Sequence, residues 1–191
     1  MNRKIILASS SKQRFNILKS LPFAIEVHPA EIDEQAVPFQ DQYDKAEQIA
    51  LAKAKKVAAY YEDAIIVAAD TFCFAKGRIL EKPKTLLEAE EMLRFQSGQE
   101  IEVLTGYAFL DTREKLQKSG CEKIMMQMRD LSDVEIRHYV QTEPVLTWSA
   151  AFSPAYDSGM ALIKSINGNF TAFSHGLPVD LFIEFLQKNQ A

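Results

Sequence analysis

Uniformly apolar runs alternate with amphipathic stretches along most of this chain. The run 64–69 is entirely apolar, which predicts a strand covered on both faces, as in a parallel sheet, and this strand is expected to end at Asp70. Apolar residues at helical spacing predict helices, and short alternating runs bounded by turn residues predict further strands. The predicted helices are 12–21, 42–61, 85–98, 132–141 and one beginning at 177; the predicted strands are 4–8, 24–28, 64–69, 72–75, 78–80, 100–110, 121–129 and 160–166. This order indicates an α/β fold with a partly parallel sheet flanked by helices.

Length and composition are those of an ordinary globular protein. The chain has 191 residues, 47% hydrophobic and 25% charged, without a repeat or an obvious linker, and we expect one domain spanning 1–191. A net charge of −4 provides no general basic field, so nucleic acid is not an expected partner. No apolar run approaches the roughly 18 residues of a membrane helix, and Cys73 and Cys121 are far apart. We therefore expect a cytoplasmic protein that does not contact membranes.

A serine-rich loop joins the first predicted strand to the first predicted helix. The amino end of a helix presents free backbone N–H groups and the positive end of the helix dipole, so it attracts phosphate. Ser9, Ser10 and Ser11 add hydroxyl donors there, and Lys12 and Arg14 add positive charge that suits an anion better than it suits the helix. The loop is a candidate phosphate site. The alternative is a serine cap with solvated basic side chains.

Lys53 falls inside the apolar stripe of the predicted helix 42–61. At about 100° per residue it lies on the same side as Ala50, Ala54 and Val57. A lysine directed at the covered face either extends to the rim of that face or contacts a bound anion, and both possibilities stay open. The neighbouring Lys55 lies away from the centre of the stripe and is expected to be solvated.

Asp70 follows six consecutive apolar residues. In open α/β sheets, ligands bind outside the carboxyl ends of the strands, which is where this arrangement would place Asp70. Burial of an unpaired carboxylate is costly, so a metal ion or a basic side chain should face it. Asp70 is therefore a candidate catalytic or metal-binding residue; the alternative is an aspartate that caps the following turn.

Other potential sites give weaker signals. Lys82 is held by the rigid Pro83 just after the predicted hairpin, but such a pair is common in loops. His28, His138 and His175 show no metal-ligand spacing. The glycine motifs of P-loop proteins, Rossmann folds and α/β-hydrolases do not occur, which disfavours those three classes.

Taken in order, these segments resemble the Maf family of nucleoside triphosphate pyrophosphatases, from Ile5 to the final helix. Each motif is short, but the ordered set is specific. Segment 6–14 (ILASSSKQR) is similar to the family's L-A-S-x-S-P-R-R, and the further matches are Asp33-Glu34 to I-D-E, Lys53-Ala54 to K-A, Ala69-Asp70-Thr71 to A-D-T, Lys82-Pro83 to K-P, Ser97-Gly98 to S-G, Thr105-Gly106 to T-G or T-A, and Gly176-Leu177-Pro178 to G-L-P.

The resemblance implies hydrolysis of a nucleoside triphosphate between the α and β phosphates with a divalent metal, Mg²⁺ or Mn²⁺. It also implies an elongated mixed sheet in two lobes around a central cleft, a homodimer, a role in nucleotide-pool house-cleaning and an association with septum formation. Carried onto this chain, it makes Asp70 the catalytic residue and a metal ligand together with Glu34. The implied phosphate-binding residues are Ser9, Ser10, Ser11, Arg14, Lys53 and Lys82.

Two segments depart from the family pattern. Lys12 and Gln13 replace the proline and the first arginine of the first loop, and 147–152 (TWSAAF) replaces D-K-A-G-x-Y. Segment 153–159 lacks the I-Q-G glutamine of thymidine/uridine-type members, which leaves the base preference open. Asp157 is not favoured as a substitute for the aspartate of D-K-A-G-x-Y, which this chain lacks. The alternatives are a nucleotide-binding regulator of cell division with little turnover, and a purine triphosphatase of the similar inosine-triphosphatase class.

Overall fold

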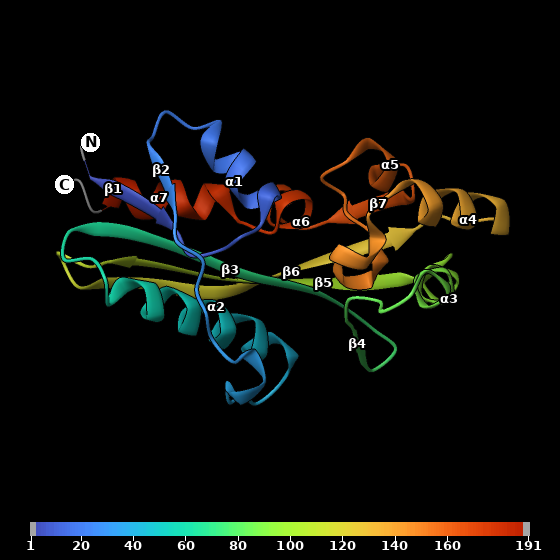
Figure 1. The fold of residues 1–191 in the computed structure, drawn as a ribbon, viewed down its shortest axis with the longest axis horizontal. Coiled ribbons are helices and arrows are strands. Elements are labelled where there is room, and N and C mark those ends of the chain that lie inside the picture. The colour runs from blue at the N-terminus through green and yellow to red at the C-terminus, as the bar shows by residue number, and fades with distance from the viewer. Residues whose placement is uncertain (1–2, 189–191) are drawn as a thin grey trace. The chain divides into compact units, whose positions relative to one another are not determined.

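The computed structural model describes residues 3–188; residues 1–2 and 189–191 of the predicted domain lie outside the described residues. Within that range seven strands form one mixed sheet flanked by helices (Figure 1). The strands are β1 (Lys4–Leu7), β2 (Ile25–Val27), β3 (Ala64–Ala75), β4 (Arg78–Leu80), β5 (Glu100–Asp111), β6 (Leu116–Met128) and β7 (Ile163–Asn167). Their order is β2-β1-β3-β5-β6-β7, with β4 paired to β3. β1 runs parallel to β2 and β3, whereas β3–β4 and β6–β7 are antiparallel, so the predicted partly parallel α/β fold is confirmed.

The helices agree closely with the hydrophobic pattern, and short helical turns appear between them. The α-helices are α1 (Lys12–Lys19), α2 (Gln42–Ala58), α3 (Leu86–Gln96), α4 (Asp133–Thr142), α5 (Asp157–Met160), α6 (Phe170–His175) and α7 (Val179–Lys188). The 3-10 turns are η1 (Glu34–Ala36), η2 (Val145–Thr147) and η3 (Ser149–Ala151). The sequence pattern did not predict α5, α6 or these turns, because three to six residues are too few to show a helical period.

Two predicted helix caps illustrate how local sequence begins these helices. Ser132 and Glu135 form a reciprocal capping box at the start of α4. Thr85 caps α3 by accepting a hydrogen bond from the backbone N–H of Glu88. The Glu88 carboxylate, however, accepts from the backbone N–H of Lys84, one residue before the cap, so this second box is only partly formed.

Several boundaries differ from the prediction; the predicted strand 121–129, for example, begins five residues earlier, as β6 (Leu116–Met128). The predicted strand 64–69 does not end at Asp70, because β3 runs without a break from Ala64 through Asp70 to Ala75. The residues after Asp70 contain no glycine or proline and favour extended backbone, so nothing local ends the strand. The last predicted strand begins later than expected: Met160 ends α5, and β7 starts at Ile163.

The described chain divides into two compact units. The first comprises the described residues up to Asp70, Thr105–Glu122 and the described residues from Phe170 onward; the second comprises Thr71–Leu104 and Lys123–Asn169. The chain thus passes from the first unit to the second inside β3, directly after Asp70.

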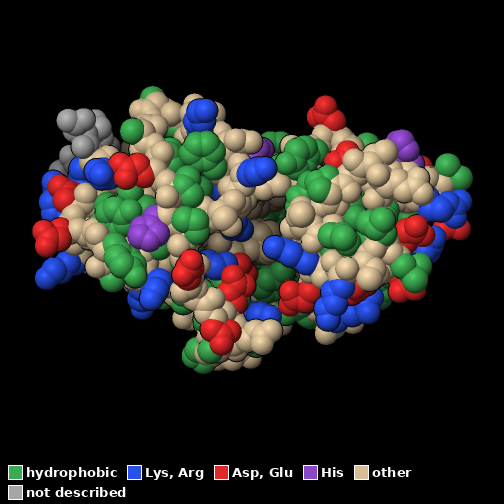
Figure 2. Space-filling model, viewed as in Figure 1, with side chains coloured by type: hydrophobic (Ala, Val, Ile, Leu, Met, Phe, Trp, Pro, Cys, Tyr) green, Lys and Arg blue, Asp and Glu red, His purple; other side chains and the backbone are tan. Residues whose placement is uncertain are grey.

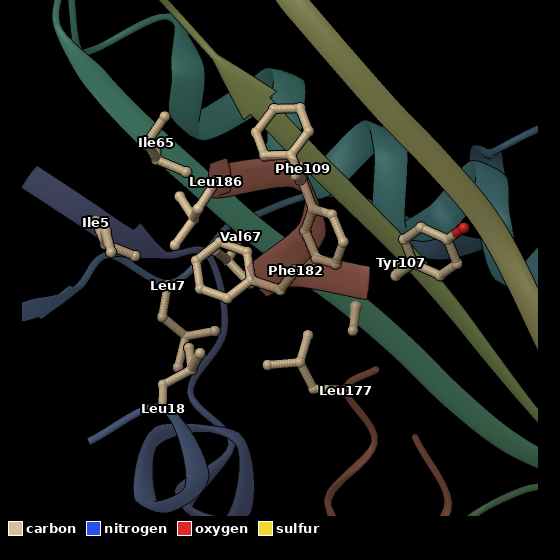
Figure 3. Close-up of a cluster of buried hydrophobic side chains, with 12 residues drawn as sticks. Ile5, Leu7, Leu18, Ile65, Val67, Tyr107, Phe109, Leu177, Phe182 and Leu186 are labelled. Atoms are coloured by element: carbon tan, nitrogen blue, oxygen red, sulfur yellow. The ribbon is translucent and has the colours of Figure 1, made fainter. Parts of the chain in front are cut away.

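In the first unit, helices cover both faces of the sheet. Alternate residues of β3 point to opposite sides, as the apolar run predicted. Ile65 and Val67 join a cluster with α1 and α7, in which Phe109 of β5 lies 5.3 Å from Phe182 of α7 between ring centroids (Figure 3). Ile66 on the other face packs with the apolar stripe of α2. Helical layers on both faces thus bury the part of β3 that leads to Asp70.

In the second unit, α3 packs against α4 and η3. Its fully buried Gln96 donates a 2.8 Å hydrogen bond from Nε2 to the carbonyl oxygen of Ala150 in η3. The backbone N–H of Gly98, just after α3, donates to the carbonyl of Arg129. The segment that departs from the family pattern is therefore hydrogen-bonded to α3.

The surface agrees with the overall charge balance. Basic and acidic side chains are interspersed on the face shown in Figure 2. None of the helices within residues 3–188 is both long enough and apolar enough to cross a bilayer.

Candidate functional site

Three of the predicted site residues meet in the first unit. The Lys53 ammonium lies 2.7 Å from Oδ1 of Asp70 and 2.8 Å from Oε1 of Glu34. The three side chains come from α2, β3 and η1. One lysine thus bridges two carboxylates that are separated from it by 17 and 19 residues of sequence.

Packing around α2 explains why Lys53 points at Asp70. Ala50, Ala54 and Val57 of α2 are buried against β1 and β3, and Lys53 shares that side of the helix with a side chain only 12% exposed. Gly106 of β5 permits this close approach, since a Cβ there would collide with the backbone carbonyl of Ala46 in α2. The lysine is therefore directed toward the sheet, and its charge is compensated by the carboxylates it contacts.

Arg14 connects the serine-rich loop to a distant segment. Its Nε donates a 3.0 Å hydrogen bond to the carbonyl oxygen of Gly176, and its Nη1 donates to Oγ of Ser9 at 3.2 Å. Burial lowers the pKa of the Arg14 guanidinium, and the negative charges of Asp70 and Glu34 act in the opposite direction. Arg14 thus belongs to the same electrostatic environment as the Lys53 cluster, and a guanidinium stays charged in proteins.

The three serines of the loop have different surroundings. Ser9 accepts from the backbone N–H of Ser11, and Ser11 both caps α1 and donates to Oε1 of Gln13 at 3.1 Å. Ser10 is exposed. The hydroxyls of Ser9 and Ser11 therefore shape the loop, which confirms the predicted serine cap without deciding between a cap and a phosphate site.

Lys82 belongs to the second unit. Its side chain is exposed, and the adjacent Pro83 is buried. The backbone carbonyl of Glu81 accepts a 3.1 Å hydrogen bond from the N–H of Ala150. The corner that carries Lys82 is therefore fixed by the divergent segment 147–152, which the sequence alone did not indicate. The role of Lys82 in phosphate binding stays a prediction.

Unusual backbone geometry marks that divergent segment. Ala150 and Ala151 have φ angles of 59° and 60°, the left-handed region that favours glycine. The resemblance offers a signal for this feature, because the family's D-K-A-G-x-Y pattern has a glycine in the segment. The Trp148 ring lies 5.2 Å from the ring of Tyr156, at 31° between planes.

The fit to a divalent metal can be judged from the available ligands. In the part of the chain that the structure describes, no group of three or more His, Cys, Asp and Glu side chains is arranged to hold a metal. Glu34 and Asp70 nevertheless present oxygens within 2.8 Å of a single nitrogen atom. Magnesium is commonly bound by one or two carboxylates together with water and substrate phosphates, so this pair fits a partial ligand set.

Comparison with known proteins gives a consistent result. The family described as "Maf-like protein" matches residues 4–189. A dTTP/UTP pyrophosphatase of Geobacter sp. (strain M21) is 33% identical over 187 residues, 97% of this chain and 95% of that protein. A dTTP/UTP pyrophosphatase of Pyrococcus furiosus is 35% identical over 185 residues, again 97% and 95%.

Solved structures extend the comparison to the fold. The Ham1 protein of Staphylococcus aureus aligns with a TM-score of 0.53 at 14% identity, covering 98% of this chain and 100% of that one. A HAM1 protein of Coxiella burnetii aligns with a TM-score of 0.54 at 16% identity, covering 97% and 99%. At such low identity these likenesses show the fold alone.

Proposed function

This chain belongs to the Maf-like protein family, and we propose that it is a nucleoside triphosphate pyrophosphatase that releases pyrophosphate and a nucleoside monophosphate. The observation that carries the proposal is the bridging of Glu34 and Asp70 by Lys53, with Arg14 in the same electrostatic environment. Acidic oxygens beside basic side chains suit a metal-bound polyphosphate. Relatives named dTTP/UTP pyrophosphatase, 33% and 35% identical, support dTTP and UTP as substrates.

The charge of each residue indicates its proposed role in the reaction. Asp70 orients or deprotonates the attacking water. Arg14 and Lys53 hold the phosphate chain in line with it, where positioning and charge neutralisation supply most of the rate. Lys82 is a further proposed phosphate ligand, on the basis of its K-P motif. Hydroxyl and backbone N–H groups of the loop 9–11 add donors to the phosphates.

A divalent metal, Mg²⁺ or Mn²⁺, fits this arrangement. Glu34 and Asp70 would hold it, and phosphate oxygens and water would complete its shell. Such an ion neutralises phosphate charge and lowers the pKa of a bound water.

Family membership also supports proposals on domain organisation, location and oligomeric state. The family match covers residues 4–189 and so spans both compact units, which supports treating 1–191 as one Maf-like domain. Both cysteines are free, which fits the reducing cytoplasm and a house-cleaning role there. The homodimer stays a prediction, and the molar mass in solution tests it.

A substrate panel tests the function. Purified protein is incubated with dTTP, UTP, 7-methyl-GTP or inosine triphosphate, with Mg²⁺ or Mn²⁺, and pyrophosphate release is measured. We expect the fastest release from dTTP and UTP. Nucleotide binding without release on any substrate would instead favour the regulator of cell division, because Thr147 and Trp148 replace the family's Asp-Lys pair. Fastest release from inosine triphosphate would favour the purine triphosphatase.

A further inference from the structure

The contacts of Lys53 have a consequence for metal binding. Its ammonium is within 2.8 Å of one oxygen on each of the two proposed metal ligands, Glu34 and Asp70. Lys53 is 12% exposed and Asp70 16%, whereas Glu34 is 51% exposed. The lysine thus occupies the more sheltered side of the pair, and solvent reaches the pair from the glutamate.

The Glu34 and Asp70 carboxylates cannot bind the Lys53 ammonium and a divalent ion together as tightly as they would bind either one alone. A divalent ion bound to Glu34 and Asp70 would either take the oxygens that Lys53 contacts or lie close to its ammonium, where like charges repel strongly because the site is partly shielded from water. Metal binding to the free protein must therefore overcome the existing ion pairs. A lysine on a flexible four-carbon stem can move away more easily than the short aspartate on β3.

On the basis of the proposed function, we propose that Lys53 competes with the metal for the Glu34–Asp70 pair and is released to the phosphates when the metal binds. In the free protein, Lys53 neutralises the two carboxylates and keeps metal affinity low. Nucleotide phosphate attracts the released ammonium and so favours metal binding. By linkage, the metal favours nucleotide binding to the same extent.

The test measures metal binding directly, without turnover. Mn²⁺ is titrated into nucleotide-free protein, and unbound Mn²⁺ is followed by electron paramagnetic resonance. Lys53→Met keeps an apolar side chain of similar length and removes the charge, so we expect Mn²⁺ to bind at least about fivefold more tightly than to the wild type. Lys53→Arg keeps the positive charge and should leave the affinity near the wild-type value.

Two further variants serve as controls. Lys56 lies on the exposed side of α2, so Lys56→Met should not change Mn²⁺ affinity if the effect is specific to the bridging position. Adding Glu34→Gln to Lys53→Met should reverse the gain. Circular dichroism spectra and thermal unfolding confirm that each variant is folded.

The outcomes separate this inference from the function on which it depends. If Lys53→Met bound Mn²⁺ no more tightly than the wild type, while Glu34→Gln still weakened Mn²⁺ binding, the competition would be overturned. The proposed metal site would then be retained. If Glu34→Gln left the Mn²⁺ affinity unchanged, both the metal site and the competition would be rejected. Pyrophosphate release is measured separately, so neither result is confused with failure of the enzymatic proposal.

Discussion

The backbone N–H of Ala150 donates a 3.1 Å hydrogen bond to the carbonyl oxygen of Glu81, the residue before Lys82. On its other side, the Ala150 carbonyl accepts a 2.8 Å hydrogen bond from buried Gln96. A left-handed turn of two alanines is thereby fixed between α3 and the loop that carries a proposed phosphate ligand. Strained backbone of this kind persists only where the surroundings hold it.

Substitutions at Ala150 should report this strain. The residue is fully buried with φ at 59°, so a β-branched side chain there is disfavoured both sterically and by its backbone conformation. We expect Ala150→Val to lower the free energy of unfolding by about 2 kcal/mol or more. Ala150→Gly should change it by less than about 1 kcal/mol, because relief of strain offsets the lost methyl group. Urea unfolding measures both, and equal effects of the two variants would contradict a left-handed turn.

Removal of the Asp70 charge should stop turnover. Asp70→Asn is nearly isosteric, but the amide neither accepts a proton nor binds a cation as a carboxylate does. We expect kcat for pyrophosphate release to fall by about 100-fold or more, with an unchanged circular dichroism spectrum. Asp157→Asn, in segment 153–159, is the matched control and should retain nearly full kcat. A wild-type rate for Asp70→Asn would show that another group activates the water.

Loss of the Lys82 charge should mainly weaken substrate binding. Lys82 is exposed, and its proposed partner is the phosphate chain. We expect Lys82→Ala to raise KM about tenfold, equivalent to about 1.4 kcal/mol, with a smaller change in kcat. Lys84→Ala removes a second exposed lysine two residues away and should leave KM unchanged. Equal effects of the two variants would indicate general electrostatic attraction rather than a specific contact.

The ion pair at the start of β1 should be important for stability. Both guanidinium Nη atoms of Arg3 donate to the Asp111 carboxylate, at 2.5 and 2.6 Å, and the Asp111 side chain is fully buried. Arg3→Met leaves that carboxylate without its cation, so we expect a loss of about 3 kcal/mol in the free energy of unfolding at neutral pH. Arg113→Met removes an exposed cation and should cost less than about 1 kcal/mol. Similar losses for both variants would show that burial of the pair is irrelevant.

The same pair predicts a pH dependence. Hydrogen bonding to Arg3 lowers the pKa of Asp111 from its ordinary 3.8. The ionised carboxylate therefore stabilises the fold above about pH 4, and this contribution is lost as the pH falls through the lowered folded-state pKa. Arg3→Met lacks this contribution, because the guanidinium no longer donates to the Asp111 carboxylate. The stability difference between wild type and variant should therefore shrink as the pH falls below about pH 4, and a difference independent of pH would exclude this cause.

The sequence by itself determined the local structure and the chemical inventory. Hydrophobic periodicity located the major helices and strands, and it placed Lys53 on the covered side of α2, because these properties depend on residues within a few turns of each other. It also supplied the ordered motifs that identify the family. It placed the strand end wrongly at Asp70, since the composition of a run does not show where sheet pairing continues.

Only the tertiary structure decided which groups meet. Glu34, Lys53 and Asp70 lie on three separate elements, and Arg14 reaches the carbonyl of Gly176 across 162 residues of sequence. No local pattern encodes such contacts, because they arise from packing α2 onto the sheet and from joining the first loop to the segment before α7. The same reason explains the left-handed Ala150, whose backbone is held by hydrogen bonds with the distant Glu81 and Gln96 rather than by its own preference.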